Sequence, residues 1–451
     1  MKALFILARD ATYRAHGAFT RSISYAPLSL TVVAALTPPG WEVTLVDEGV
    51  QPPRTTGSFD VVGVSCVAAS APRAYELTDF WKRRGAYTLL GGIHPTLAPD
   101  EAARHADTTI VGFAEHCLPR FWDDYTAGRP QARYEDDLGP RGGAGGGAPV
   151  VLRTPRPRRD LLTNRYMSAV GVIANQGCPH RCTFCAIGAR CLHRSLPRPV
   201  ADVVDELTSL GARRVVMLDP SLTSDREYAL ELLAAMAPLR LRWGGLATLD
   251  VADDPPLLDA LTRAGCMGLL IGFESVTPTN LARAAKTTNA VPAYKTAVGR
   301  LHEHGIRVLG TFVVGFDDDT PDSLAQTLEV IDEIGVDLPR FGILTPFPGT
   351  PLHRALRAQG RLLTDDLRLY DETHAVFAPA RMSAAALEDA YARSWREAYT
   401  YRRIRARASD PLSWSLNLAF RWHGRALARL AERGRTNRAG PISHEHEETT
   451  C

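Results

Sequence analysis

Short apolar segments alternate with amphipathic, helix-length segments through two long stretches of this 451-residue chain. Strands that alternate with helices in this way are typical of parallel sheets. In the first stretch, strands are expected at residues 2–8, 42–47, 60–65, 88–91 and 108–111. Helices are expected at residues 28–36, 71–84, 99–105 and 117–125. The pattern therefore predicts a doubly wound, Rossmann-like α/β domain over residues 1–130.

A second alternating stretch begins near Met167. Strands are expected there at residues 168–174, 214–218, 242–246, 268–271, 307–314 and 337–344. The helices between them are expected at residues 200–210, 225–236, 255–264, 291–304 and 321–333. Six consecutive strand–helix units predict a partial parallel (β/α)6 barrel over residues 166–352, with its site at the carboxyl ends of the strands.

Two further segments complete the predicted organisation. Residues 131–165 contain the glycine-rich run Gly142–Pro149 and a stretch rich in proline and arginine, which predict a linker. Residues 353–435 are expected to be mostly helical, and the polar residues 436–451 to form a disordered tail. The basic segment Trp395–Arg435 is partly amphipathic, and two interpretations stay open: a membrane-surface helix, or a solvated helix packed on the barrel.

Three cysteines, Cys178, Cys182 and Cys185, lie within eight residues of one another. Thiolates crowded in this way form a soft, sulfur-rich site that suits zinc or an iron–sulfur cluster. A structural zinc site wants a fourth ligand, usually from a second Cys or His pair at matching spacing, and no such pair follows. The spacing favours a 4Fe–4S cluster with one open iron, and a zinc knuckle is the alternative.

Charge and hydropathy exclude several classes of function. The net charge of +2 and the lack of a nucleic-acid motif argue against a nucleic-acid partner. No run of about 18 apolar residues is present, so no transmembrane segment is expected. Reduced thiolates that await a metal indicate a reducing compartment, and the predicted location is cytoplasmic.

Candidate ligand-binding loops follow three strands of the first domain. In doubly wound sheets ligands bind outside the carboxyl ends of the strands, and glycines there let the backbone approach a bulky ligand. The candidate residues are Ser65, Gly91, Gly92, His94, Gly112 and Glu115. For His94, which precedes a proline in a glycine-rich turn, a structural or hydrogen-bonding role is the alternative.

The cysteine run, with Phe184 just before its last cysteine, resembles the signature of radical S-adenosylmethionine (SAM) enzymes. The loops of the first domain follow in the order seen in cobalamin-binding domains fused ahead of such enzymes. This similarity extends to about residue 400 and implies three cofactors: a 4Fe–4S cluster, SAM and cobalamin. The segment Gly272–Ser275 resembles the family's Gly-x-Glu-Ser, which implies that Glu274 and Ser275 contact SAM; a helix cap is the alternative reading.

The chain departs from the family pattern at three places. Phe113 stands where the first acid of a Gly-Glu-Ala-Glu motif is usual. No Asp-x-His-x-x-Gly motif is present, so the resemblance implies a cobalamin whose lower face lacks a protein imidazole, and His94 as a cobalt ligand is disfavoured. The loop Asp219–Ser221 lacks the glycine-rich pattern that contacts the amino group of SAM in many relatives.

The resemblance implies methylation of an unactivated carbon in a small-molecule natural product or lipid. That reaction would use a 5′-deoxyadenosyl radical and methylcobalamin, with an electron donor such as flavodoxin or ferredoxin. An oxidative cyclase, or another bond-forming enzyme without methyl transfer, is the second hypothesis. A non-catalytic cobalamin-binding sensor is the third, and the intact cysteine triad argues against it.

Overall fold

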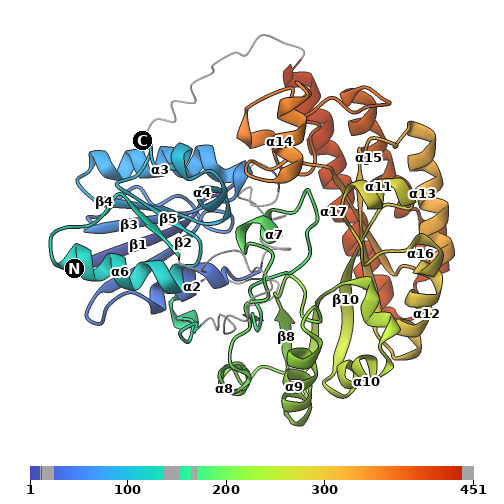
Figure 1. Ribbon diagram of the computed structural model, residues 1–451, viewed down its shortest axis with the longest axis horizontal. Coiled ribbons are helices and arrows are strands. Elements are labelled where there is room, and N and C mark those ends of the chain that lie inside the picture. Colours follow the sequence, from blue (N-terminus) through green and yellow to red (C-terminus); the bar gives the residue numbers. More distant parts are fainter. Residues whose placement is uncertain (11, 13–24, 137–152, 164–165, 167–169, 439–451) are drawn as a thin grey trace, which may run out of the picture.

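The computed structural model describes residues 1–10, 12, 25–136, 153–163, 166 and 170–438, with side chains described up to Arg429 in the last helix (Figure 1). The glycine-rich run Gly142–Pro149 and the tail after residue 438 lie outside the described residues. The described chain forms two parallel sheets followed by a helical C-terminal region.

The first sheet has six parallel strands in the order β2-β1-β3-β4-β5-β6. Their bounds are β1 Lys2–Leu7, β2 Glu42–Asp47, β3 Val61–Ser65, β4 Tyr87–Gly91, β5 Thr108–Val111 and β6 Arg133–Glu135. The order reverses at β1, which has β2 on one side and β3 on the other, and such a switch point opens a crevice at the carboxyl ends of the strands. The predicted doubly wound sheet is confirmed.

Helices cover both faces of this sheet. Figure 1 shows α3 (Ala71–Arg83) on one face, with α2 (Leu28–Ala35) and α6 (Ala114–Thr126) on the other. The central strand β1 is buried on both sides because its Ala3, Leu4, Phe5 and Ile6 are all apolar. Parallel strands of this kind show continuous apolar runs rather than alternation.

The second sheet also has six parallel strands, here in strict chain order from β7 to β12. The strands are β7 Gly171–Val172, β8 Arg214–Met217, β9 Arg242–Ala247, β10 Cys266–Glu274, β11 Arg307–Val314 and β12 Leu338–Ile343. The crossover helices are α8 Val200–Ser209, α9 Arg226–Met236, α10 Pro255–Arg263, α12 Tyr294–Glu303 and α13 Pro321–Ile334. In the described residues β7 and β12 do not pair with each other, so the predicted partial barrel is confirmed.

Most predicted elements match within one or two residues, and those at 42–47, 108–111 and 307–314 match to the residue. The predicted helix at 99–105 ends early, at Ala102, and the one at 117–125 begins three residues early, at Ala114. Of the strand expected at 168–174, residues 168 and 169 lie outside the described residues. The elements that were missed are β6 and the short helices α4 Ile93–Leu97, α7 Ala186–Arg190, α11 Pro278–Arg283 and α14 Pro351–Ala358.

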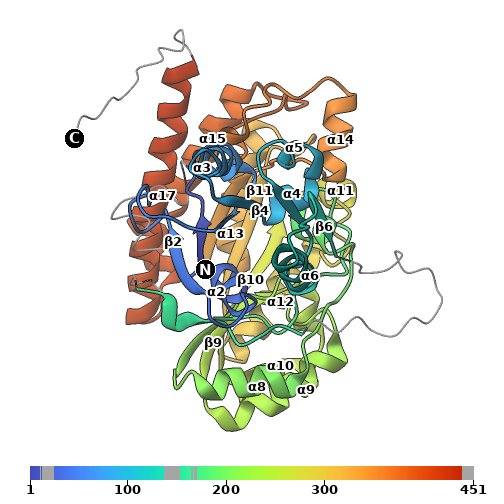
Figure 2. The same cartoon turned by 90° about the vertical axis from the view of Figure 1, so that its left-hand side faces the viewer.

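The C-terminal region is helical, as predicted. Helix α15 (Ala384–Ala398) packs on α13 and β12, and α16 (Tyr401–Arg407) and α17 (Pro411–Arg438) follow it. Trp395 and Tyr399 are fully buried there, and the Trp395 ring contacts Phe341 of β12. Figure 2 shows α17 as a long rod beside the barrel. None of the described helices combines the length and the apolarity needed to cross a bilayer.

The first domain contacts the barrel through small apolar clusters. Ala68 of the first domain packs with Tyr370 and Val376, and Phe113 packs with Cys191 and Leu196. Gly349, after β12, has φ +82°, and a Cβ there would lie 2.6 Å from the carbonyl oxygen of Leu97. These contacts hold the first domain against the barrel and the C-terminal region.

Candidate functional site

A large cleft lies where the carboxyl ends of the first sheet meet the start of the barrel. Its empty space is about 1500 Å³, open solvent at its mouth included. Apolar side chains from β1, α2, β4 and β5 form most of its wall, among them Phe5, Leu7, Leu30, Val33, Leu89 and Ile110. A cleft that is mostly apolar with a few polar groups is typical of a ligand-binding site.

Two glycines of the cleft have backbone conformations that side chains disfavour. Gly92 has φ +111°, and a Cβ there would lie 2.5 Å from the carbonyl oxygen of Cys66. Gly112 has φ +96°, and its Cβ would collide with the carboxylate of Asp136. Only glycine fits at either position, because a side chain there would collide with the protein itself. Both glycines line the cleft, and loops of this kind at the strand ends fit a large cofactor such as cobalamin.

Of the six loop residues predicted from the sequence, five line the cleft: Ser65, Gly91, Gly92, Gly112 and Glu115. His94 does not. It is buried beside α3, where its Nε2 lies 3.1 Å from the Tyr75 hydroxyl and 3.5 Å from a Glu101 oxygen. The hydrogen bond from His94 lowers the pKa of Glu101. Within the described part of the chain, His94 Nδ1 is buried without a partner.

The linker and the start of the barrel contribute a polar wall to the same cleft. Thr154 and Gln176 both donate to Glu115 Oε1, at 2.9 and 2.7 Å. Further along this wall, the buried Arg198 and Glu206 form a salt bridge of 2.8 Å, and Arg159 donates to the other oxygen of Glu206. The sequence analysis missed this wall because its members are far apart in the chain and share no motif.

The three cysteines of the triad lie on the loop between β7 and α7. Two residues of the cleft wall lie before and after them in the chain: Gln176 on the same loop, and Arg190 at the end of α7. The Arg190 guanidinium lies 4.1 Å from the ring centroid of Phe113, so it contacts the first domain directly. Backbone hydrogen bonds fix the loop: Thr183 N–H donates to the carbonyl of Ala284, and Leu352 N–H donates to that of Thr183. The cysteine loop and the cleft thus share a boundary.

All three thiols are free, and burial raises their pKa values, that of Cys178 to about 11. Among the residues that the structure describes, no three His, Cys, Asp or Glu side chains converge closely enough to hold a metal ion. A metal binds the thiolate form of cysteine, so binding of a cluster at these cysteines would release the thiol protons. The donor set itself, three soft sulfur atoms on one loop, fits an iron–sulfur cluster.

Beside the cysteine loop, Glu274 at the end of β10 forms a buried ion pair with Lys286, at 3.0 Å. Burial alone would lower the pKa of Lys286, but the charge of Glu274 and its hydrogen bond outweigh this effect and raise that pKa. Glu274 has φ +62°, a strained conformation for a residue with a side chain. Ser275 Oγ accepts a hydrogen bond from Thr277 N–H at 3.1 Å, just ahead of α11.

Buried polar atoms that have no partner among the described residues lie after β8, which is two strands from β10 in the sheet. Asp219 is fully buried; its Oδ1 accepts hydrogen bonds from the backbone N–H groups of Ala174 and Asn175. Its Oδ2 is buried without a partner in the described residues, as are Ser221 Oγ and Thr223 Oγ1. Buried polar atoms rarely stay unsatisfied. Together with Glu274 and Lys286, these groups fit an amino acid-bearing ligand such as SAM.

Asp219 gives the cofactor-free protein a specific pH dependence. Burial raises its pKa from 3.8 to about 7, so the folded state holds this proton more tightly than the unfolded state. The contribution of Asp219 to the free energy of unfolding is complete below about pH 4. It decreases by about 4 kcal/mol in total as the pH rises to about 7. We expect Asp219→Asn to equal the wild type in urea denaturation near pH 4 and to exceed it near pH 8. Equal stability of the two proteins at both pH values would contradict this.

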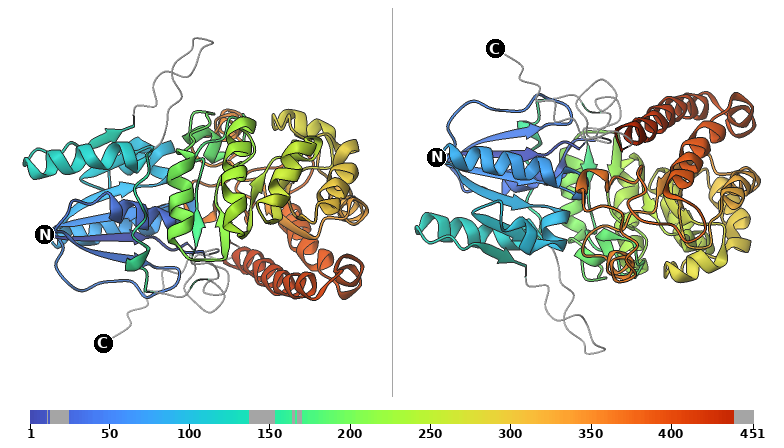
Figure 3. Two further views of the ribbon diagram at one scale, coloured as in Figure 1. Left: turned by 90° about the horizontal axis from the view of Figure 1, so that it is seen from below. Right: turned by 90° about the horizontal axis from the view of Figure 1, so that it is seen from above.

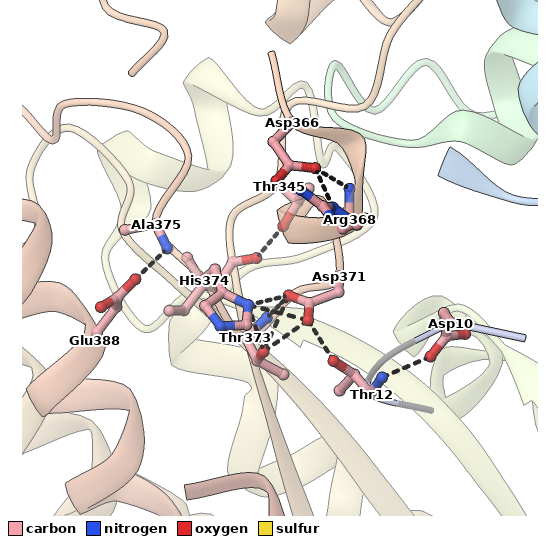
Figure 4. Close-up of polar contacts among 11 residues, drawn as sticks. Asp10, Thr12, Thr345, Asp366, Arg368, Asp371, Thr373, His374, Ala375 and Glu388 are labelled. Atoms are coloured by element: carbon pink, nitrogen blue, oxygen red, sulfur yellow. Dashed lines mark hydrogen bonds and ion pairs between the residues drawn. The ribbon is translucent and has the colours of Figure 1, made fainter. Parts of the chain in front are cut away.

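A second buried polar cluster joins the two domains at the end of β12. Figure 4 shows the Asp371 carboxylate between Thr12, Thr373 and His374. His374 Nδ1 lies 2.9 Å from Asp371 Oδ1, and the Thr12 hydroxyl of the first domain donates to Asp371 Oδ2. The N–H of Ile343 donates to the carbonyl of Glu372 at 2.7 Å, which places this cluster at the carboxyl end of β12.

Two family models match the chain. Residues 20–121 match the B12 binding domain, and residues 172–331 match the radical SAM superfamily. The two matches correspond to the sheet that bears the cleft and to the barrel that bears the cysteine loop.

Curated relatives and solved structures match most of the chain. It is 30% identical over 401 residues to bacteriochlorophyllide d C-12(1)-methyltransferase of Chlorobaculum tepidum, covering 86% of each chain. It is 26% identical to hopanoid C-2 methylase of Rhodopseudomonas palustris, over 76% of this chain and 66% of that one. The structure of TsrM, a radical SAM methyltransferase from Kitasatospora setae, superposes with a TM-score of 0.67 at 18% identity, over 97% and 99% of the two chains. That likeness shows a common fold.

Proposed function

The chain belongs to the family of cobalamin-binding radical SAM enzymes, and we propose that it methylates an unactivated carbon of a small-molecule natural product or lipid. Its cofactors are a 4Fe–4S cluster, SAM and cobalamin. When bound, these groups supply the radical and the methyl group for the reaction, and the protein supplies binding, orientation and exclusion of water. Relatives named for a bacteriochlorophyllide and a hopanoid support a substrate of this general class.

We assign the cofactors to residues as follows. Cys178, Cys182 and Cys185 hold the cluster. Glu274 and Ser275, with Lys286 beside them, bind the polar end of SAM, because a carboxylate accepts from ribose hydroxyls or an ammonium and a lysine ammonium donates to a carboxylate. The cleft loops, with Ser65, Gly91, Gly92, Gly112 and Glu115 on their rim, hold cobalamin.

Cobalamin is assigned to one part of the chain, and the cluster and SAM are assigned to another. Residues 1–130 form the cobalamin-binding domain, 131–165 the linker, 166–352 the radical SAM barrel and 353–435 the C-terminal cover. Strand β6, at Arg133–Glu135, pairs with β5 and extends the first sheet slightly past residue 130. The sheet and the barrel each supply one wall of the cleft, so both are needed for activity.

One observation carries this proposal: the cleft and the cysteine loop share a wall. Gln176 and Arg190 line the cleft, and they lie on either side of the three cysteines. A ligand in the cleft and a cluster on the loop are therefore neighbours across this wall. Methyl transfer to a carbon activated at the cluster requires that proximity.

The test is anaerobic reconstitution with iron, sulfide and cobalamin, followed by turnover with methyl-labelled SAM and a lipid and pigment extract. A product heavier by one CH₂ unit that carries the label supports methylation. Loss of hydrogen without label incorporation supports the cyclase alternative instead. If no 5′-deoxyadenosine forms in the fully loaded protein, the enzymatic proposal fails.

A variant with a larger side chain in the cleft can test cobalamin binding without a change at the cysteine loop. Val33 of α2 lines the cleft and is only partly buried, so a larger side chain there has room to enter it. We expect Val33→Trp to lower cobalamin retention at least about tenfold after gel filtration, by overlap with the ligand. Iron content should not change. Val33→Ala, which leaves the cleft open, is the matched control, and equal retention by both variants would place cobalamin elsewhere.

We also propose an acidic electron-transfer protein, such as flavodoxin or ferredoxin, as the reductant, and a cytoplasmic location, where the thiols stay reduced. Cluster reduction by purified flavodoxin, followed by visible absorption, tests the first of these.

A further inference from the structure

The buried face of α17 fixes which of its residues point outward. Ser413, Asn417, Leu427 and Ala428 are buried, and Gly424 packs so closely on Trp395 that an added Cβ would lie 2.3 Å from its ring. This contact leaves no freedom for α17 to rotate about its axis. The residues on its opposite face therefore form a defined outer surface.

That outer surface carries an exposed apolar stripe. Trp414, Leu418 and Trp422 follow one another at four-residue spacing, which places them on one side of a helix. Their exposed fractions are 36%, 42% and 49%. Leu412 and Tyr401 lie nearby in the chain, so five of the nine exposed large hydrophobic residues in the described chain belong to this one segment. A concentration of this kind marks an interaction surface.

Arginines continue the same helical face. Arg425 lies three residues after Trp422, and Arg429 lies four residues after Arg425, so both are on the same side of the helix. Arg421 instead donates to the carbonyl oxygen of Tyr399. Arg425 and Arg429, together with Arg396 of α15, line a small surface cleft. In the described part of the chain, no salt bridge involves Arg425 or Arg429. Guanidinium groups bind phosphate oxygens in pairs, so this cleft is suited to a phosphate group.

We propose that this face of α17 binds the surface of a membrane that contains anionic phospholipid. Tryptophan favours the boundary between water and acyl chains, and arginines beside it would contact lipid phosphates. Figure 3 shows α17 along an outer edge of the molecule. The charge of the arginine cleft favours an anionic surface, and the apolar stripe favours a bilayer over a soluble anion.

The test uses the full-length, anaerobically purified protein and sedimentation with lipid vesicles. We expect at least about tenfold stronger binding to phosphatidylcholine vesicles that contain phosphatidylglycerol than to pure phosphatidylcholine vesicles, with a decrease at high salt. Arg425→Glu/Arg429→Glu should lose the preference for anionic lipid. Trp414→Ser/Leu418→Ser/Trp422→Ser should lose binding to both kinds of vesicle.

The matched control is Leu363→Ser, which changes an equally exposed apolar residue outside this region. It should bind vesicles as the wild type does. Circular dichroism and iron content check that each variant is folded. No binding by the wild type, or equal binding by the wild type and the stripe variants, overturns the proposal. Self-association that the stripe variants abolish, without vesicle binding by the wild type, assigns the face to a second copy of the chain and also overturns it.

Discussion

Replacement of Cys178, Cys182 or Cys185 by alanine, one at a time, is expected to remove the visible absorption of the reconstituted cluster and to lower 5′-deoxyadenosine formation at least about 100-fold. In metal sites, loss of a residue that only hydrogen-bonds to a metal ligand costs about 10–100-fold in metal affinity or activity. The three cysteines are proposed as the ligands themselves, so a larger effect is expected. Two remaining thiols would leave a second iron of the cluster without a protein ligand. Iron content and product analysis measure both effects.

The chain offers two matched controls for this experiment. Cys191 lies six residues after the triad, is fully buried, and accepts a hydrogen bond from Cys178 N–H at 3.3 Å. Cys266 is a buried thiol at the start of β10. Cys191→Ala and Cys266→Ala are expected to keep their iron and to form 5′-deoxyadenosine. Full iron content in a triad variant, or loss of iron in Cys191→Ala, would contradict the proposed ligand set.

Removal of the Lys286 ammonium is the second change with a large expected effect. Lys286→Ala would leave the Glu274 carboxylate buried without its ion-pair partner, and such a loss costs about 3–5 kcal/mol of folding free energy. It would also remove a donor for the carboxylate of SAM. We expect lower stability in urea denaturation of the cofactor-free protein, and weaker SAM binding in anaerobic equilibrium dialysis of the cluster-loaded protein.

A double variant separates these two effects. Lys286→Met with Glu274→Leu removes both charges, so it should recover most of the stability, because two apolar groups replace a buried ion pair at little cost. SAM binding should stay lost. The exposed pair Lys295–Glu333 is the matched control: Lys295→Ala should change stability by less than about 0.5 kcal/mol. If the double variant binds SAM as the wild type does, Glu274 and Lys286 have only a structural role.

The fold was predictable because its strands carry strong local patterns. Strand β11 alternates buried and partly exposed residues from Arg307 to Val314, and its predicted bounds match. Strand β6 was missed because it has only three residues, of which Tyr134 alone is buried. Strand β10 was expected to be shorter because register shifts at both of its ends interrupt the pattern, and its pairing still extends to Glu274.

The candidate site was predictable where its residues are close in the sequence. The cysteine triad and the glycine loops are local motifs, so their chemistry could be read directly. Lys286 is twelve residues from Glu274, and Glu206 reaches Arg159 across 47 residues, so neither pair has a local signal. His94 looked like a ligand-binding residue because it follows two glycines, but the turn of α4 directs its ring toward Tyr75.

The hydrogen bond between Thr12 and Asp371 joins positions 359 residues apart, and this separation has a consequence for synthesis of the protein. The first sheet is complete in the nascent chain long before Asp371 leaves the ribosome. Until then, the contacts of Tyr370 and Val376 with Ala68 are also missing, so the first domain is held only by earlier contacts such as that of Phe113 with Cys191 and Leu196. A bulky cofactor therefore has time to enter the cleft during translation, before the last quarter of the chain adds these contacts.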